Sequence, residues 1–226
     1  MGYSGEDNLE VMNSADNYNQ HLVDFVVNNL PKKCDKLLDF GSGNGFFARK
    51  ITEKTKKMVL CVEPAENMHK FYKTEPFLSL SNVENGSLGC IYSLNVLEHI
   101  EDDEAVVKDF YRALSKNGVL LLYLPAFPCL YSSMDKKVGH FRRYKKKDVQ
   151  RLFSENYWSI EQVRYVDFLG CFASFLFKFM GNDSGTLSLT WLKIYDKFVF
   201  PLSLLLDKLT MGKILGKNII IKCIKK

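Results

Sequence analysis

The chain has 226 residues, of which 46% are hydrophobic and 25% are charged. This length suits one domain with a full hydrophobic core, and the composition excludes a disordered or fibrous protein. None of the six cysteines forms a CxxC pair, which argues against a zinc knuckle and against a small disulfide scaffold. We expect these cysteines to be buried thiols in a reducing compartment.

Charge is distributed unevenly along the sequence. Residues 1–134 contain 13 Lys and Arg against 18 Asp and Glu, a net charge of −5. Residues 135–226 contain 18 Lys and Arg against 8 Asp and Glu, a net charge of +10. The asymmetry suggests that the second half meets an anionic partner: a phosphorylated metabolite, a lipid surface or nucleic acid.

No targeting or membrane-spanning segment is evident in the sequence. The first 30 residues are acidic and polar, without the basic and apolar regions of a secretory signal. The longest apolar run, 168–177, falls short of the ~18 residues that span a bilayer. We therefore expect a cytoplasmic protein that is soluble, with peripheral contact to a membrane as an open alternative.

Apolar periodicity predicts strands that alternate with helices over the first 125 residues. The segment 1–30 is expected to form an N-terminal helical cap. The segment 167–218 is expected to form a helical insertion before the last strand, with a break at 181–185. The predicted strands cover 37–40, 58–62, 77–80, 89–94, 119–124, 158–166 and 218–224, and further helices are predicted over 65–73, over 101–114, from 46 and from 148.

The strands up to residue 125 are apolar on both faces. Such strands are typical of a parallel sheet that helices cover on both sides, so we predict an α/β fold with a mostly parallel, seven-stranded sheet. No internal repeat or low-complexity linker divides the sequence, which indicates a single domain over residues 1–226.

The strongest motif is the glycine-rich segment DFGSGNG, residues 39–45, between a buried strand and a helix. Glycine allows the backbone to adopt positive φ angles and to approach a ligand at the helix N-terminus. A dinucleotide-binding fold would need GxGxxG, but Phe46 stands where the third glycine would be. The spacing here is GxGxG, preceded by an acid at the end of the strand.

The segment LLDFGSGNGFFARKI, residues 37–51, resembles the first motif of class I S-adenosylmethionine-dependent methyltransferases. Glu63 ends the next strand, where that family has an acid, and SLNVLEHI at residues 93–100 is similar to the family's segment after strand four. The likeness covers residues 15–166. It implies a Rossmann-like fold, S-adenosylmethionine as cofactor, and a small-molecule methyltransferase subgroup with VLEHI and GHxRRY segments.

The resemblance also implies which residues hold the cofactor. Glu63 would accept hydrogen bonds from both ribose hydroxyls, a task that suits a carboxylate. Asp39 is equally well explained as a residue that holds the amides of the turn, and Tyr18 as a half-buried aromatic residue. Glu98 and His99 look catalytic, but in the family this pair mostly supports the fold. The implied cofactor-binding residues are Tyr18, Asp39, Gly41, Gly43, Gly45, Glu63 and Asn95.

In the resembled family the methyl acceptor enters over strands four and five, which places residues 125–145 at its site. His140 is the candidate catalytic base for a hydroxyl acceptor, or else a histidine bonded to backbone in a structured loop. Arg142 and Arg143 would clamp a phosphate or carboxylate, or else tie the loop to the sheet. Tyr131 completes the expected substrate-binding set.

Methylation of nucleic acid is not favoured. The Pro128-Cys129 pair follows strand five rather than strand four, and the D/N-P-P-Y/F motif is absent. No metal site is expected. We expect methyl transfer, at oxygen, to a small-molecule acceptor or one linked to lipid or glycan. The alternatives are N-methylation, an RNA methyltransferase, and a cofactor-binding module without turnover.

Two runs rich in Phe and Leu occupy the segment 167–218 at helical spacing. They form either a helical pair packed on the sheet or on a homodimer partner, or a lid or membrane-facing surface that admits an apolar acceptor. The lysines toward the end of the chain would favour an anionic membrane, namely Lys208, Lys213, Lys217, Lys222, Lys225 and Lys226.

Overall fold

The computed structural model describes residues 11–179 and 188–226. The first ten residues of the expected N-terminal cap and the expected break at 181–185 therefore lie outside the described residues. The described chain forms a six-stranded sheet of order β2-β1-β3-β4-β6-β5, in which β1 to β4 are parallel and β6 is antiparallel to both of its neighbours. The strands are β1 (Leu37–Phe40), β2 (Val59–Val62), β3 (Leu88–Leu94), β4 (Leu114–Pro125), β5 (Trp158–Val166) and β6 (Asn218–Lys225).

The expected strand at 77–80 does not form, so the described sheet has six strands rather than the seven that were predicted. Phe77 forms a single parallel bridge to Val62, donating to the Cys61 carbonyl and accepting from the Glu63 amide. Pro76 before it has no N–H to donate, and Ser79 after it caps a short 3₁₀ turn, Leu80–Asn82. Pairing therefore ends after one residue. The helix expected at 65–73 is also a 3₁₀ helix, Glu66–Phe71.

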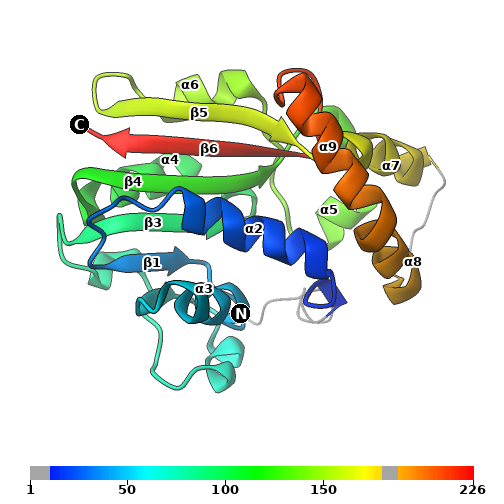
Figure 1. Ribbon diagram of the computed structural model, residues 1–226. Helices are drawn as coiled ribbons and strands as arrows, with labels where there is room; N and C mark the ends of the chain where they lie inside the picture. The colour runs from blue at the N-terminus through cyan, green and yellow to red at the C-terminus, as the bar shows by residue number, and fades with distance from the viewer. Residues whose placement is uncertain (1–10, 180–187) are drawn as a thin grey trace.

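The sheet separates two apolar layers. Alternate residues of β4 point to opposite faces: Leu120 belongs to the layer with α4 (Asp103–Ala113) and α6 (Lys146–Leu152), and Leu121 to the layer with α2 (Asp16–Asn28) and α3 (Phe46–Thr55). Figure 1 shows α2 in front of the sheet and α4 and α6 behind it. Burial on both faces explains why the central strands read as continuous apolar runs.

A second group of helices lies beyond the carboxyl ends of the parallel strands (Figure 1). It consists of α5 from the segment after β4, and of the helices that connect β5 to β6. A π-helical turn joins two of these helices into one longer rod. Their bounds are α5 (Ser133–Lys137), α7 (Phe168–Phe179), α8 (Leu189–Ile194), the π turn (Tyr195–Val199) and α9 (Phe200–Thr210).

Buried polar side chains fix how this rod faces the rest of the molecule. Asp207 accepts hydrogen bonds from the amides of Asp167 and Phe168 at 2.7 and 3.0 Å, at the start of α7. Asp167 in turn accepts from the hydroxyls of Ser203 and Tyr195 at 2.8 and 2.6 Å. Because these groups are buried, their pairing fixes the rotation of α9 about its own axis.

Asp196, from the π turn, caps the N-terminus of α2. Its two carboxylate oxygens accept from the amides of Asn17 and Tyr18 at 2.9 and 2.8 Å. The residue at the N-cap position, Ala15, has no side chain that could do this. A carboxylate from 179 residues away therefore accepts hydrogen bonds from the free N–H groups of the helix N-terminus. Its negative charge also interacts favourably with the positive end of the helix dipole.

All six cysteines are free thiols, but only Cys34, Cys90 and Cys223 are buried as expected, whereas Cys61 and Cys171 are half-buried and Cys129 is exposed. Burial raises the pKa of Cys61 and of Cys223 to about 12, which keeps both protonated. Within the described residues, none of the helices has the length and apolar character needed to cross a bilayer.

We expect Asp196→Ala to lower the free energy of unfolding by about 1–2 kcal/mol, because two helix N–H groups lose their acceptor. Denaturant unfolding measures the change. Asp16→Ala, an exposed acid in the same first turn of α2, is the matched control and should cost only a few tenths of a kcal/mol. Equal losses in the two variants would contradict the long-range cap.

Candidate functional site

The turn that follows β1 brings its backbone against the end of β3. Gly41, Gly43 and Gly45 have φ angles of 74°, 54° and 72°, which L side chains rarely adopt. A Cβ atom on Gly41 would lie 2.4 Å from a methyl carbon of Val96. Glycine at position 41 is therefore required by the backbone conformation and also by the close approach.

Glu63 holds this turn from the neighbouring strand β2. Its carboxylate accepts from the amide of Gly43 at 2.7 Å and from the amide of Ala65 at 2.9 Å. Burial raises the pKa of Glu63, although both backbone hydrogen bonds act against the rise. Each carboxylate oxygen keeps a second lone pair, so the group can accept further hydrogen bonds.

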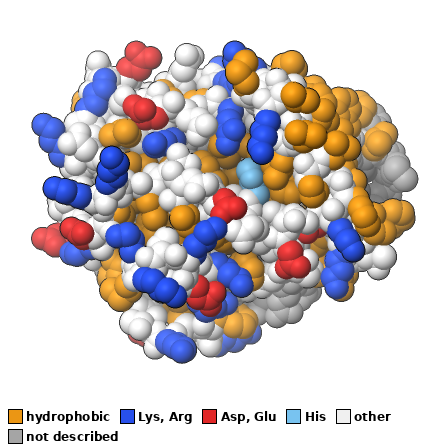
Figure 2. Space-filling model, in the orientation of Figure 1, with side chains coloured by type: hydrophobic (Ala, Val, Ile, Leu, Met, Phe, Trp, Pro, Cys, Tyr) orange, Lys and Arg blue, Asp and Glu red, His pale blue; other side chains and the backbone are white. Residues whose placement is uncertain are grey.

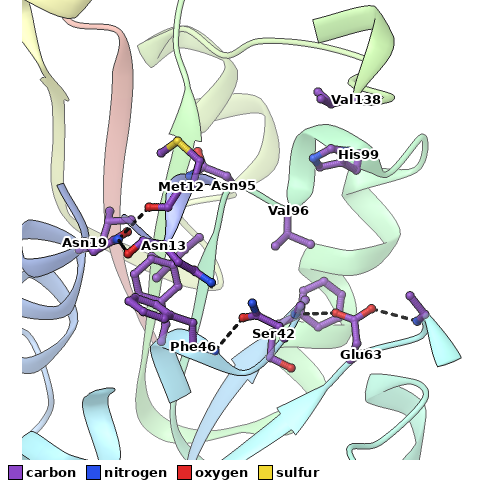
Figure 3. A pocket seen from close by; sticks show the side chains of 18 of the residues that line it. Met12, Asn13, Asn19, Ser42, Phe46, Glu63, Asn95, Val96, His99 and Val138 are labelled. Atoms are coloured by element: carbon purple, nitrogen blue, oxygen red, sulfur yellow. Dashed lines mark hydrogen bonds between the residues drawn. The ribbon is translucent and has the colours of Figure 1, made fainter. Parts of the chain in front are cut away.

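A cavity of about 850 Å³ opens above these strand ends. Its wall combines the turn after β1, Glu63, the segment after β3, α2 and parts of α5 and α8. Figure 3 shows Ser42 and Glu63 on one side of this space, with Asn95 and His99 above them. This volume lies within the usual range for small-molecule sites.

The structure gathers most, though not all, of the residues singled out in the sequence. Lining the cavity are Tyr18, Gly41, Gly43, Glu63, Asn95 and His140. The remaining residues are not part of its described wall: Asp39, Gly45, Tyr131, Arg142 and Arg143.

Tyr18 and Asn95 form one contact across the cavity wall. The amide of Asn95 donates to the Tyr18 hydroxyl at 3.0 Å, and the Tyr18 ring packs edge-on against Tyr123 and Phe200. Asn95 has a φ angle of 55°, so the chain turns sharply as it leaves β3. Burial raises the pKa of Tyr18 well above its usual range, so the phenol stays protonated.

Asp39 lies beneath the turn rather than on the cavity wall. The amides of Gly41 and Ser42 donate to the Val62 carbonyl, so Asp39 does not hold them. Burial raises the pKa of Asp39 to about 8. A largely protonated acid at this depth fits a structural position in β1.

His140 is paired with Asp135 at the other side of the cavity. Its Nδ1 lies 2.7 Å from Asp135 Oδ1, and Arg143 contacts both oxygens of the same carboxylate at 2.9 Å. Burial alone would raise the pKa of Asp135, but the hydrogen bonds with His140 and Arg143 outweigh it and hold this pKa well below its usual range. An ionised Asp135 orients the imidazole and directs Nε2 away from itself.

Glu98 and His99 surround the same imidazole. A carboxylate oxygen of Glu98 lies 3.8 Å from His140 Nε2, and the rings of His99 and His140 meet edge to face at 4.5 Å between centroids. Burial raises the pKa of Glu98 to about 8 and lowers that of His99 to about 4. At neutral pH both groups are therefore largely uncharged.

The remaining residues of the 131–143 loop bind to the protein itself. The Tyr131 hydroxyl donates to the His140 carbonyl at 2.6 Å. Arg142 pairs with Asp103 at 2.8 Å and donates to the carbonyl of Glu101. These contacts favour an internal role for both arginines rather than an anion clamp. Arg142 ties the loop to the start of α4, and Arg143 binds Asp135 of α5 and the carbonyl of Ala126 after β4.

Sequence reasoning missed the contribution of the α8 segment and of Lys217. Leu192 and Tyr195 line the cavity together with Asp196. Lys217 also lines it and is the one lysine or arginine among the described lining residues, and burial lowers its pKa. Asp196 could have been noticed as the one acid between residues 188 and 206.

The residues present fit a bound nucleoside. Gly41 and Gly43 present backbone without side chains on the cavity wall, and the buried carboxylate of Glu63 lines the same space. A vicinal diol presents two donors to one such acceptor. Fold and site together define a nucleoside-binding α/β protein with the ligand at the carboxyl ends of parallel strands.

The comparisons with known proteins agree with that class. The family described as "Methyltransferase domain" matches residues 14–164, and the chain therefore belongs to the methyltransferase domain family of enzymes. A comparison with curated protein sequences found no match.

Three solved structures illustrate the shared fold. An Archaeoglobus fulgidus SAM-dependent methyltransferase is 15% identical, covering 94% of this chain and 95% of its own, with a TM-score of 0.61. Geranyl diphosphate C-methyltransferase from Streptomyces coelicolor A3(2) is 12% identical, covering 96% and 84%, with a TM-score of 0.65. Haemonchus contortus phosphoethanolamine N-methyltransferase 2 is 17% identical, covering 92% and 52%, with a TM-score of 0.57. At these identities the likeness shows the fold.

We expect Gly41→Ala to destabilise the protein by about 1–3 kcal/mol more than Gly86→Ala. Both glycines have positive φ angles, so both variants carry the same backbone penalty of about 1–2 kcal/mol. Only at Gly41 does the new methyl group meet Val96, whereas nothing lies within 4 Å at Gly86. Denaturant unfolding compares the variants, and equal losses would show that the turn can move away from β3.

Proposed function

We propose that this enzyme takes its methyl group from S-adenosylmethionine, bound at the turn after β1. The observation that carries the proposal is the buried Glu63 carboxylate beside the glycine turn, on the wall of the cavity. In this proposal Glu63 accepts hydrogen bonds from the ribose hydroxyls, while Gly41 and Gly43 admit the ligand to the backbone. Tyr18 and Asn95 line the adjoining part of the cavity, and Asp39 and Gly45 shape the turn from below.

When bound, S-adenosylmethionine supplies an electrophilic methyl group on a sulfonium centre. The protein must then align an acceptor atom in line with that methyl group and exclude water around it. The cavity is large enough for both molecules to share, and its wall includes apolar side chains such as Met134, Val138 and Leu192. This lining supports a small-molecule or lipid-linked acceptor rather than a strand of nucleic acid.

We propose that the acceptor is methylated at oxygen, with His140 as the general base. A hydroxyl group must lose its proton during transfer, and an imidazole held by an ionised Asp135 can accept it at Nε2. Glu98 lies 3.8 Å from that nitrogen and is largely protonated, so it does not serve as the base itself. N-methylation remains the alternative, since an uncharged amine needs less help from a base.

In the acceptor site, Tyr131, Arg142 and Arg143 act through the loop that carries His140. Their polar groups hold the His140 carbonyl, Asp103 and Asp135 in place. Lys217, on the cavity wall, is the better candidate to meet an anionic part of the acceptor. In this proposal the chain works as one domain in the cytoplasm, with residues 167–218 as a helical insertion over the site.

Titration calorimetry with S-adenosylhomocysteine tests the donor site. We expect Glu63→Ala to weaken binding by about 1–3 kcal/mol, because a charged acceptor is lost. Glu66→Ala is the matched control, since this exposed acid lies three residues away and is not part of the described cavity wall. Unchanged affinity in the Glu63 variant, or no binding by the wild type, would overturn the assignment.

A transfer assay with isotopically labelled S-adenosylmethionine tests the acceptor chemistry and excludes a module without turnover. The assay uses polar and lipid extracts as acceptors, and NMR of the labelled methyl group distinguishes O-methyl from N-methyl products. We expect His140→Asn to slow O-methyl transfer by about 10²–10⁴-fold, with the affinity for S-adenosylhomocysteine and the Tm unchanged. An N-methyl product, or full activity in this variant, would contradict the base assigned here.

A further inference from the structure

An apolar stripe runs along the outside of the rod formed by α8, the π turn and α9. Its residues follow one another at intervals of three or four, so they share one helix face, and all of them are exposed. Beside the stripe, α7 packs against α9 and exposes Phe172, Phe175 and Leu176. The stripe consists of Trp191, Ile194, Phe198, Leu202, Leu205 and Leu209.

Figure 2 shows hydrophobic side chains gathered over the region where Figure 1 places α7 and α9. Of the eighteen large hydrophobic side chains that are exposed in the described chain, twelve belong to residues 172–214. Apolar side chains exposed singly are ordinary, but a continuous face of this kind marks an interaction surface. We call this surface, formed by α7, the stripe and the adjoining Met211 and Ile214, the apolar face.

The outward orientation of the apolar face is fixed by the polar contacts on its other side. Asp196, Ser203 and Asp207 lie on the inner side of the rod, all buried and all hydrogen-bonded to α2 or to the start of α7. Rotating the rod to bury its leucines would break these hydrogen bonds. The backbone amides of α2 and of the start of α7 would then lose their acceptors. The inner side of the helix therefore holds these buried polar groups together with Phe200 and Leu204, and the apolar stripe faces outward.

The exposed charged side chains of the segment that forms the apolar face have a single sign. Within residues 168–179 and 188–217, both acids, Asp196 and Asp207, are buried. The charged side chains exposed there are all lysines: Lys178, Lys193, Lys197, Lys208 and Lys213. An apolar surface with a cationic rim complements the acyl boundary and the anionic head groups of a bilayer.

We propose that the apolar face docks this protein on the surface of an anionic lipid bilayer. The rod lies along the membrane, since within the described chain no helix could cross it. A second copy of the chain fits less well, because a two-fold interface through this face would bring two lysine rims of like charge together. A bilayer offers the opposite charge and an apolar interior at the same time.

The docked helix also reaches the cavity. In α8, Trp191 and Ile194 are exposed on the apolar face, while Leu192 between them lines the cavity. An apolar acceptor could thus pass from the bilayer past α8 to the site, a step that rests on the proposed function. Docking itself does not depend on methyl transfer and can be tested without an acceptor.

Tryptophan fluorescence and vesicle flotation test the docking. Trp191 is 72% exposed and the other tryptophan, Trp158, is 3% exposed, so a blue shift on adding vesicles reports on the apolar face. We expect the blue shift and flotation with vesicles that contain phosphatidylglycerol, weaker binding to pure phosphatidylcholine, and loss of binding as salt rises.

The double variant Leu205→Glu/Leu209→Glu should bind the anionic vesicles at least about tenfold more weakly, since two exposed leucines that would insert into the bilayer are lost and two like charges are added beside its anionic head groups. Met58→Glu is the matched control, because Met58 is 74% exposed and lies before β2, outside the apolar face. No blue shift and no flotation by the wild type, or equal binding by the double variant, would overturn the proposal. So would a stable dimer in light scattering that Leu205→Glu/Leu209→Glu converts to a monomer.

Calorimetry with S-adenosylhomocysteine in the absence of vesicles separates this proposal from the preceding one. Leu205 and Leu209 are not part of the described cavity wall, so the double variant should keep the wild-type affinity, which also shows that it is folded. Flotation without nucleoside binding would refute the methyl donor and leave docking standing. Binding without flotation would refute docking alone.

Discussion

The approach of the turn after β1 to the end of β3 is the constraint on which the site depends. Gly41 leaves no space for a side chain beside Val96, and the amide of Gly43 is held by Glu63 from the adjacent strand. The segments that follow three parallel strands thus contact one another through the glycine backbone, Val96 and the Glu63 carboxylate. Parallel pairing supplies this geometry, because it brings the ends of β1, β2 and β3 to the same edge of the sheet.

Features encoded locally could be predicted from the sequence. The strand at 158–166 was predicted with its observed bounds, and the mostly parallel sheet was confirmed because runs buried on both faces have an unmistakable composition. The glycine turn and Glu63 were placed correctly relative to each other since both follow directly from strand ends. The short strand at 77–80 was wrong in extent, because whether a bridge continues depends on neighbours that periodicity does not specify.

Partner choice across long distances could not be predicted. An arginine side chain can bind an anionic ligand as well as a carboxylate of the protein itself. Only the fold shows that Arg142 pairs with Asp103 and that Arg143 pairs with Asp135. The part of the cavity wall that comes from α8 depends on how residues near 195 pack on α2, far away in sequence. In the same way, the apolar spacing along α8, the π turn and α9 is also typical of core helices. Only the structure shows that their buried polar residues face inward and their apolar stripe faces outward.

The carboxylate of Asp196 joins two elements that both contribute to the cavity wall. Two hydrogen bonds connect it to the backbone of α2, and the Asn17 side chain adds a third to the Asp196 carbonyl at 2.9 Å. Lifting α2 alone, or α8 alone, would break all three. The helix that bears Tyr18 and the helix that bears Trp191 are thus linked, so a displacement of α8 at the outer surface is coupled to the part of the cavity wall that α2 supplies.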